Sequence, residues 1–78
     1  MKIAEKKHVE RYVKSRGIVK QYRRAKQFLK AGNFQAVEFK KRQPKEFDIW
    51  YFRITKKYRG HCIWQGDTII IFDVDDHQ

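Results

Sequence analysis

The sequence contains one cysteine, one proline and no long run of apolar residues. The single cysteine, Cys62, excludes an internal disulfide and favours a reducing compartment. No apolar run approaches the roughly 20 residues that a membrane-spanning helix needs. The basic residues 1–7 are followed by no apolar stretch of the kind found in a secretory signal. We therefore expect a cytoplasmic protein with no membrane partner.

Acidic residues are scarce in the first part of the chain. Residues 1–45 contain fifteen Lys and Arg but three acids, whereas residues 46–78 contain four Lys and Arg and six acids. The net charge of +10 exceeds what solubility requires, so a polyanionic or acidic partner is expected. A length of 78 residues and a hydrophobic content of 41% predict one domain, residues 1–78, with one small core.

Helical periodicity fills the first half of the chain. Ile3, Val9 and Val13 lie near helical spacing, and a clearer apolar stripe runs from Ile18 to Leu29 in steps of three and four. Glycines at positions 17 and 32 interrupt the pattern where helices would end. The sequence therefore predicts helices over residues 3–15 and 18–31, arranged as an antiparallel hairpin with its basic faces in water.

From residue 36 the apolar period changes to two. Strands are predicted over residues 49–55, 58–64 and 68–74, joined by tight turns at residues 56–57 and 65–67, after a polar loop around Pro44. Helices followed by strands indicate an α+β fold, with the N-terminal helical hairpin on one face of a small antiparallel sheet.

Alternation along the strands predicts which side chains face the helices. The set expected on the core side comprises Trp50, Phe52, Ile54, Tyr58, Cys62, Trp64, Ile70, Phe72 and Val74. The set expected on the open face comprises Ile49, Tyr51, Arg53, Thr55, Arg59, His61, Ile63, Asp73, Asp75 and His77. The register between strands is not determined by the sequence, and a slip of one residue would invert a face.

Two arginines in adjacent strands suggest a phosphate site. Arg53 and Arg59 each present a guanidinium fork that holds two phosphate oxygens and stays charged at any working pH. The alternative is a solvated arginine, or one paired with Asp73 or Asp75. His77 and His61 are candidates for acid–base chemistry, although a histidine close to the chain end can simply be exposed.

A cluster of cations precedes these strands. Lys40, Lys41, Arg42 and Lys45 form a basic segment suited to an RNA backbone, with a solvated surface as the alternative. Tyr51 could stack on a base or fill the rim of the site. His, Cys, Asp and Glu lack the spacing of metal ligands, so no metal, cofactor or small-molecule ligand is expected.

At these residues the chain resembles RelE-type toxins of bacterial toxin–antitoxin systems, within the RelE/ParE superfamily and nearest its HigB-like members. The resemblance rests on residues 38–42, on Trp50-x-x-Arg53-Ile54-x-x-x-Tyr58-Arg59, on Gly66-Asp67 and on Val74-Asp75-x-His77. HigB-like members carry tyrosine where this chain has Asp76. The family fold opens with a short strand, for which Met1–Ile3 is too short to be convincing.

The resemblance implies a toxin that inhibits translation as a ribosome-dependent, metal-independent mRNA endoribonuclease (an mRNA interferase), silenced by a cognate antitoxin protein. It also implies catalytic roles for Arg53, Arg59 and His77 and RNA contacts through Lys40 and Lys41. Two alternatives remain: a non-catalytic relative that binds RNA or DNA by charge, and a ParE-like inhibitor of DNA gyrase.

Overall fold

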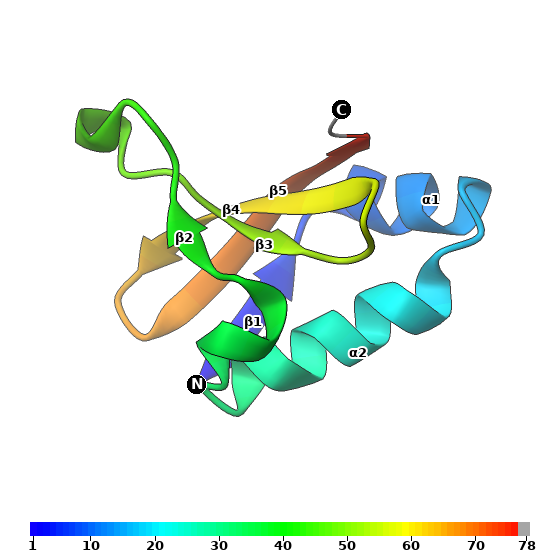
Figure 1. Ribbon diagram of the computed structural model, residues 1–78, viewed down its shortest axis with the longest axis horizontal. Helices are drawn as coiled ribbons and strands as arrows, with labels where there is room; N and C mark the ends of the chain where they lie inside the picture. Colours follow the sequence, from blue (N-terminus) through cyan, green and yellow to red (C-terminus); the bar gives the residue numbers. More distant parts are fainter. Residues whose placement is uncertain (77–78) are drawn as a thin grey trace.

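The computed structural model describes residues 1–76 as one α+β unit (Figure 1). Five strands form one open sheet in the order β1-β5-β4-β3-β2. The strands are β1 (Lys2–Glu5), β2 (Lys40–Lys41), β3 (Trp50–Arg53), β4 (Tyr58–Gln65) and β5 (Thr68–Asp76). The helices are α1 (Lys7–Ser15) and α2 (Val19–Lys30), with short 3₁₀ helices at η1 (Phe34–Val37) and η2 (Lys45–Phe47).

The chain opens with a strand, which corrects the prediction of a helix over residues 3–15. Residues 2–5 form β1 and pair in parallel with residues 68–71 of β5, so the sheet is mixed rather than antiparallel. Four residues are too few to show a period, and the segment gains its hydrogen bonds from a strand more than sixty positions away. The first helix begins only at Lys7.

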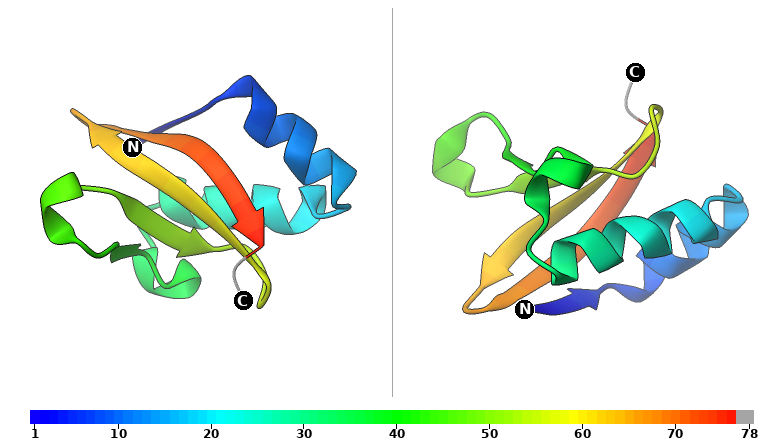
Figure 2. Two further views of the ribbon diagram at one scale, coloured as in Figure 1. Left: turned by 90° about the horizontal axis from the view of Figure 1, so that it is seen from above. Right: turned by 60° about the horizontal axis from the view of Figure 1, so that its bottom comes forward.

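The two helices lie on one face of the sheet, as predicted. Helix α2 turns back after the short link that contains Gly17, whose φ of +68° is a left-handed conformation that favours glycine (Figures 1 and 2). The expected helical stripe faces the core, with Ile18, Tyr22, Ala25 and Leu29 buried. The helix predicted over residues 18–31 is thus observed within one residue at each end.

The predicted meander of three strands is confirmed, with altered lengths. The middle strand extends to Gln65 and the last to Asp76, whereas β3 ends at Arg53, before the expected Thr55. The two-residue apolar period that begins at residue 36 does not correspond to a strand at its start. Residues 34–37 form the 3₁₀ helix η1, and only residues 40–41 pair with β3.

A β-bulge in β5 changes part of the predicted face assignment. His61 pairs with Asp73 but Cys62 pairs with Ile71, so Phe72 is an extra residue without an opposite partner in β4. An extra residue reverses the alternation on its N-terminal side. Ile69 and Ile71 therefore fill the core in place of the predicted Ile70 and Phe72, while Val74, beyond the bulge, is buried as expected.

The remaining core prediction largely agrees with the structure. Phe52 and Cys62 are fully buried, and Trp50 and Ile54 pack against the core. The ring of Phe52 lies over Gly60 on the neighbouring strand, where a Cβ atom would collide with it. Trp64 stays 36% exposed, with its ring packed edge-on against Phe34 of η1 and against Phe39.

A polar anchor joins β1 to α2. The hydroxyl of Tyr22 donates to Glu5 Oε1 at 2.6 Å, and Lys26 Nζ donates to the same oxygen at 2.9 Å. Partial burial acts to raise the pKa of Glu5, but the hydrogen bonds from Tyr22 and Lys26 outweigh it and lower that pKa. This anchor fixes the short edge strand, which has little apolar area of its own.

Candidate functional site

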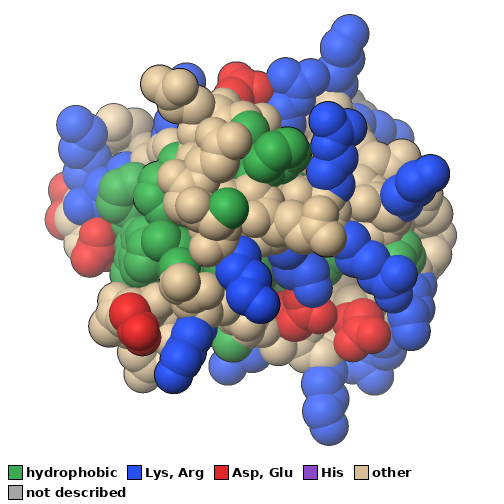
Figure 3. Space-filling view, turned by 90° about the horizontal axis from the view of Figure 1, so that it is seen from below, with side chains coloured by type: hydrophobic (Ala, Val, Ile, Leu, Met, Phe, Trp, Pro, Cys, Tyr) green, Lys and Arg blue, Asp and Glu red, His purple; other side chains and the backbone are tan. Residues whose placement is uncertain are grey.

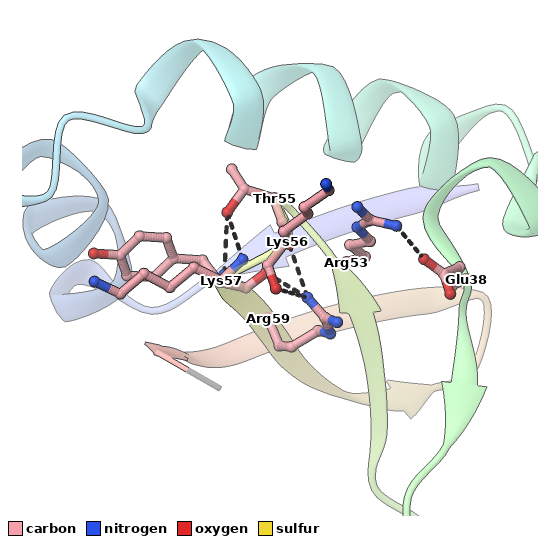
Figure 4. Close-up of polar contacts among 7 residues, drawn as sticks. Glu38, Arg53, Thr55, Lys56, Lys57 and Arg59 are labelled. Atoms are coloured by element: carbon pink, nitrogen blue, oxygen red, sulfur yellow. Dashed lines mark hydrogen bonds and ion pairs between the residues drawn. The ribbon is translucent and has the colours of Figure 1, made fainter. Parts of the chain in front are cut away.

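Arg53 and Arg59 lie directly opposite each other in the β3–β4 pair. Residues that pair across an antiparallel ladder share a face, with Cβ atoms about 4.5–5.5 Å apart. This face is the one turned away from the buried side chains of Phe52 and Cys62. From these paired positions the two guanidinium groups extend to different partners, Arg53 toward Glu38 and Arg59 toward the turn after β3 (Figure 4).

Arg53 forms an ion pair with Glu38. Its Nη1 donates to Glu38 Oε2 at 2.8 Å, and both side chains are partly exposed. The hydrogen bond from Arg53 lowers the pKa of Glu38, so this carboxylate is charged at neutral pH. The alternative pairing with Asp73 or Asp75 is not the one that forms.

Arg59 braces the turn between β3 and β4. Its Nη1 donates to the carbonyl oxygens of Thr55 at 2.8 Å and Lys56 at 3.3 Å (Figure 4). The same turn is held by Thr55 Oγ1, which accepts from the backbone N–H groups of Lys57 and Tyr58, each at 3.1 Å. These bonds engage one terminal nitrogen of the guanidinium, so the fork keeps donors for another ligand.

The neighbouring row of the sheet carries four polar residues. Lys40 pairs with Tyr51, Tyr51 with His61, and His61 with Asp73. These residues share the face of the two arginines, because they alternate with core positions along each strand. Four of the predicted site residues therefore occupy adjacent positions on β3 and β4: Tyr51, Arg53, Arg59 and His61.

His61 is the most buried polar residue of this face. It is 7% exposed, and its Nε2 lies 2.9 Å from Asp75 Oδ1. Its Nδ1 is buried and has no hydrogen-bond partner among residues 1–76. Asp75 is also the residue opposite Arg59 in the β4–β5 register, so these three residues are neighbours on one face of the sheet.

The predicted basic cluster is divided between two faces. Lys41 pairs with Trp50, on the opposite face of the sheet from Lys40, and its Nζ lies 3.0 Å from Asp48 Oδ1. Arg42 is exposed in the loop that follows β2, and Lys45 is exposed at the start of η2. Only Lys40 thus lies in the same row as the site, with the other cations at its margin.

His77, the predicted acid, lies outside the described residues. Two of the preceding acids lie near basic side chains: Asp73 lies 3.8 Å from His8 Nε2, and Asp76 lies 3.6 Å from Lys57 Nζ. Within residues 1–76, no three His, Cys, Asp or Glu side chains gather as metal ligands would. Burial raises the pKa of the Cys62 thiol to about 12, which disfavours a thiolate nucleophile.

Helix α2 presents a strongly basic surface. Its sequence contains five Lys and Arg and no acid, and cations predominate in the view from the side of α2 (Figure 3). Helix α2 covers the face of the sheet that buries Phe52 and Cys62, whereas Tyr51 and His61 lie on the opposite face. The charge asymmetry predicted from the first 45 residues is therefore a feature of the folded surface.

Sequence reasoning missed one carboxylate at this site and did not predict the partner of another. Glu38 pairs with Arg53, and Asp75, which was expected on the open face, lies against His61. Glu38 has a left-handed φ of 51°, which no pattern in the sequence predicts. For Asp75 the alternation signal placed the residue on the correct face, but the partner depends on register.

A scan against protein-family models finds no match to this chain, and a search of curated proteins finds no similar sequence. No helix among residues 1–76 is long and apolar enough to cross a membrane.

Proposed function

We propose that the chain is a toxin that cleaves mRNA on the ribosome, as an endoribonuclease that uses no metal. The observation that carries the proposal is the opposition of Arg53 and Arg59 on one face, next to the His61–Asp75 pair. Two further observations support it. The chain opens with a short strand, β1, as the resemblance to RelE-type toxins implies, and the basic surface suits a polyanionic substrate.

The arginines supply electrostatic stabilisation in this proposal. Cleavage begins when the 2′-hydroxyl of the substrate loses its proton to solvent and attacks the adjacent phosphorus. Negative charge then accumulates on the non-bridging oxygens, where guanidinium groups donate hydrogen bonds. The bond to the 5′-oxygen breaks, leaving a 2′,3′-cyclic phosphate. Arg53 must exchange Glu38 for phosphate, whereas Arg59 can use nitrogens not engaged with the turn.

One of the two histidines moves a proton in this proposal. The resemblance assigns protonation of the departing 5′-oxygen to His77. His61 is adjacent to Arg59 on the same face but is almost enclosed, so we assign it a positioning role that holds Asp75 beside the arginine. Lys40, with Lys41, Arg42 and Lys45 at the margin, binds the RNA backbone, and Tyr51 provides a ring for stacking on a base.

Single-turnover cleavage of ribosome-bound mRNA tests the proposal. The double variant Arg53→Ala/Arg59→Ala should abolish cleavage and relieve growth arrest on induction. Arg11→Ala/Lys14→Ala removes the same two positive charges from the exposed surface of α1 and serves as the matched control. Circular dichroism checks that each variant folds. Toxicity that survives the double substitution would remove the arginines from the mechanism.

A second variant examines the residue outside the described range. His77→Ala should reduce the cleavage rate by roughly 10²–10⁴-fold, the usual contribution of a positioned acid or base. Association with ribosomes should persist at low salt and weaken steeply with added salt, because backbone contacts come from lysine and arginine. Cleavage at the wild-type rate would exclude His77 as the acid.

One observation favours a second candidate, a non-catalytic RNA-binding module. Arg53 and Arg59 both make internal hydrogen bonds, and His61 is nearly enclosed, so the face offers charge without an accessible base. Such a protein would bind ribosomes with the same salt dependence but leave mRNA intact. Absence of cleavage by the wild-type protein would select this candidate.

The proposed toxin also needs a protein that silences it and an environment that contains ribosomes. We propose a cognate antitoxin with an acidic surface and a cytoplasmic location. The support for the antitoxin is the cationic surface, which no acidic segment of residues 1–45 neutralises. Affinity purification from the native host should recover a small acidic protein, and its absence would contradict this part of the proposal.

A further inference from the structure

A cavity separates α2 from η1 and the end of β3. Its volume is about 250 Å³, and its walls include Ala25, Phe28, Val37 and Ile54. Two guanidinium groups also line it: Arg24 from α2 and Arg53 from β3. A half-open cavity that combines apolar side chains with convergent charged groups is typical of a binding site rather than of a packing defect.

The Arg53 side of the cavity already holds a carboxylate. In Figure 4, Arg53 reaches from β3 toward Glu38, with α2 above them. The pair is 2.8 Å long, but the Glu38 side chain is 49% exposed, so another carboxylate can replace it at a small energetic cost. Glu38 holds its position from a left-handed backbone conformation at the end of η1.

The Arg24 side has no such partner. The guanidinium carbon of Arg24 lies 5.7 Å from the centre of the Phe28 ring, and no carboxylate within residues 1–76 pairs with it. Helix α2 contains no acid that could approach it. The cavity therefore offers one cation with no ion-pair partner and one with an exposed, replaceable partner.

We propose that this cavity binds an acidic and apolar segment of a partner protein. A carboxylate of the partner replaces Glu38 on Arg53, a second carboxylate meets Arg24, and an apolar side chain fills the space between them. A peptide places apolar side chains next to carboxylates, which matches both the walls and the rim. An RNA phosphate is flanked by hydrated ribose, which gains little from apolar walls.

Glu38 then acts as an internal competitor for the partner. Any ligand carboxylate must displace it, so removing its charge should strengthen binding. If the proposed function is correct, the bound partner also withdraws Arg53 from the RNA, and binding inhibits cleavage. Only this consequence depends on the proposed function, because the cavity can bind a peptide whether or not the protein cleaves mRNA.

The experiment uses the full chain and a short, end-blocked peptide that alternates leucine and glutamate. Fluorescence polarisation measures the dissociation constant, and methyl NMR shifts of Val37 and Ile54 report the location. Glu38→Gln should tighten binding by about threefold to tenfold, and Arg24→Ala should weaken it by about tenfold or more. Arg23→Ala is the matched control, because Arg23 is the adjacent arginine of α2 and does not line this cavity.

Three results would overturn the inference. The first is equal binding of a peptide with glutamine in place of glutamate, which would make the carboxylates irrelevant. The second is an equal effect of Arg23→Ala and Arg24→Ala, which would indicate general charge attraction. The third is a change in the methyl NMR chemical shifts of Val37 and Ile54 on adding an oligouridylate RNA but not on adding the peptide. The assay contains no ribosome or mRNA, so its failure leaves the cleavage proposal standing.

Discussion

Substitution of Arg59 should have two separable effects, because this side chain both braces a turn and faces the open surface. Arg59→Ala removes the donor to the carbonyl oxygens of Thr55 and Lys56. Hydrogen bonds from a charged group contribute about 1.5–3 kcal/mol. Arg59 is only half-buried, so solvent screening reduces that value, and we expect a loss of about 1 kcal/mol in the free energy of unfolding.

A loss of this size does not unfold a small domain whose stability is about 5 kcal/mol or more. It should lower the melting temperature by about 4–8 °C, the usual response of a domain of this size. Cleavage should fall much further, by about 10²-fold or more, because a donor to the developing phosphate charge is lost. The two effects differ enough in size to be measured on the same sample.

Arg59→Lys distinguishes charge from geometry. Lysine keeps the positive charge, but its ammonium group cannot hold two phosphate oxygens as a guanidinium fork does. We therefore expect Arg59→Lys to recover part of the lost stability and little of the lost cleavage. Urea unfolding followed by circular dichroism gives the stability, and single-turnover cleavage at 25 °C, where each variant remains folded, gives the rate.

The reasoning fails if cleavage by Arg59→Ala falls only in proportion to the unfolded fraction. In that case Arg59 would be a turn residue with no role toward phosphate. The reasoning also fails if Arg59→Lys restores the full wild-type rate, because a point charge would then be sufficient. Arg11→Ala, on the exposed surface of α1, controls for the loss of one positive charge.

Three further predictions concern stability and reactivity. Gly60→Ala should lower the free energy of unfolding by roughly 1–3 kcal/mol in urea titrations, because its Cβ collides with the ring of Phe52. The Glu5 carboxylate has a lowered pKa in the folded state, so its stabilising contribution is complete well above pH 4.5 and is lost as the pH falls below that value. Glu5→Gln should remove this loss of unfolding free energy at acidic pH, and Tyr22→Phe should make the loss smaller. Cys62, with a thiol pKa of about 12, should resist iodoacetamide at pH 8 until urea unfolds the chain, as mass spectrometry can record.

Local patterns in the sequence determined much of the fold. The stripe from Ile18 to Leu29 predicts α2, because apolar residues at three- and four-residue steps can share a core only in a helix. Alternation along β3 and β4 placed Arg53, Arg59 and His61 on the open face, since successive side chains of a strand point to opposite sides. These features depend on neighbours a few positions away, and the composition itself accounts for the basic surface.

Other features arose only from the tertiary structure. The strand β1 forms because β5 offers it an edge, and a segment of four residues carries no period that would reveal this pairing. The bulge at Phe72 moves Ile69 and Ile71 into the core, and it depends on how β4 and β5 align along their whole length.

The partners of the site residues were likewise decided in three dimensions. The ion pair between Arg53 and Glu38 joins positions fifteen residues apart, through a left-handed turn at the end of η1. The His61–Asp75 contact requires the register of two strands. Along β3 and β4 the sequence alone thus determined which side of the sheet each polar group faces, because alternation is local. Tertiary structure decided which of them touch, because register and bulges reflect the packing of the whole sheet.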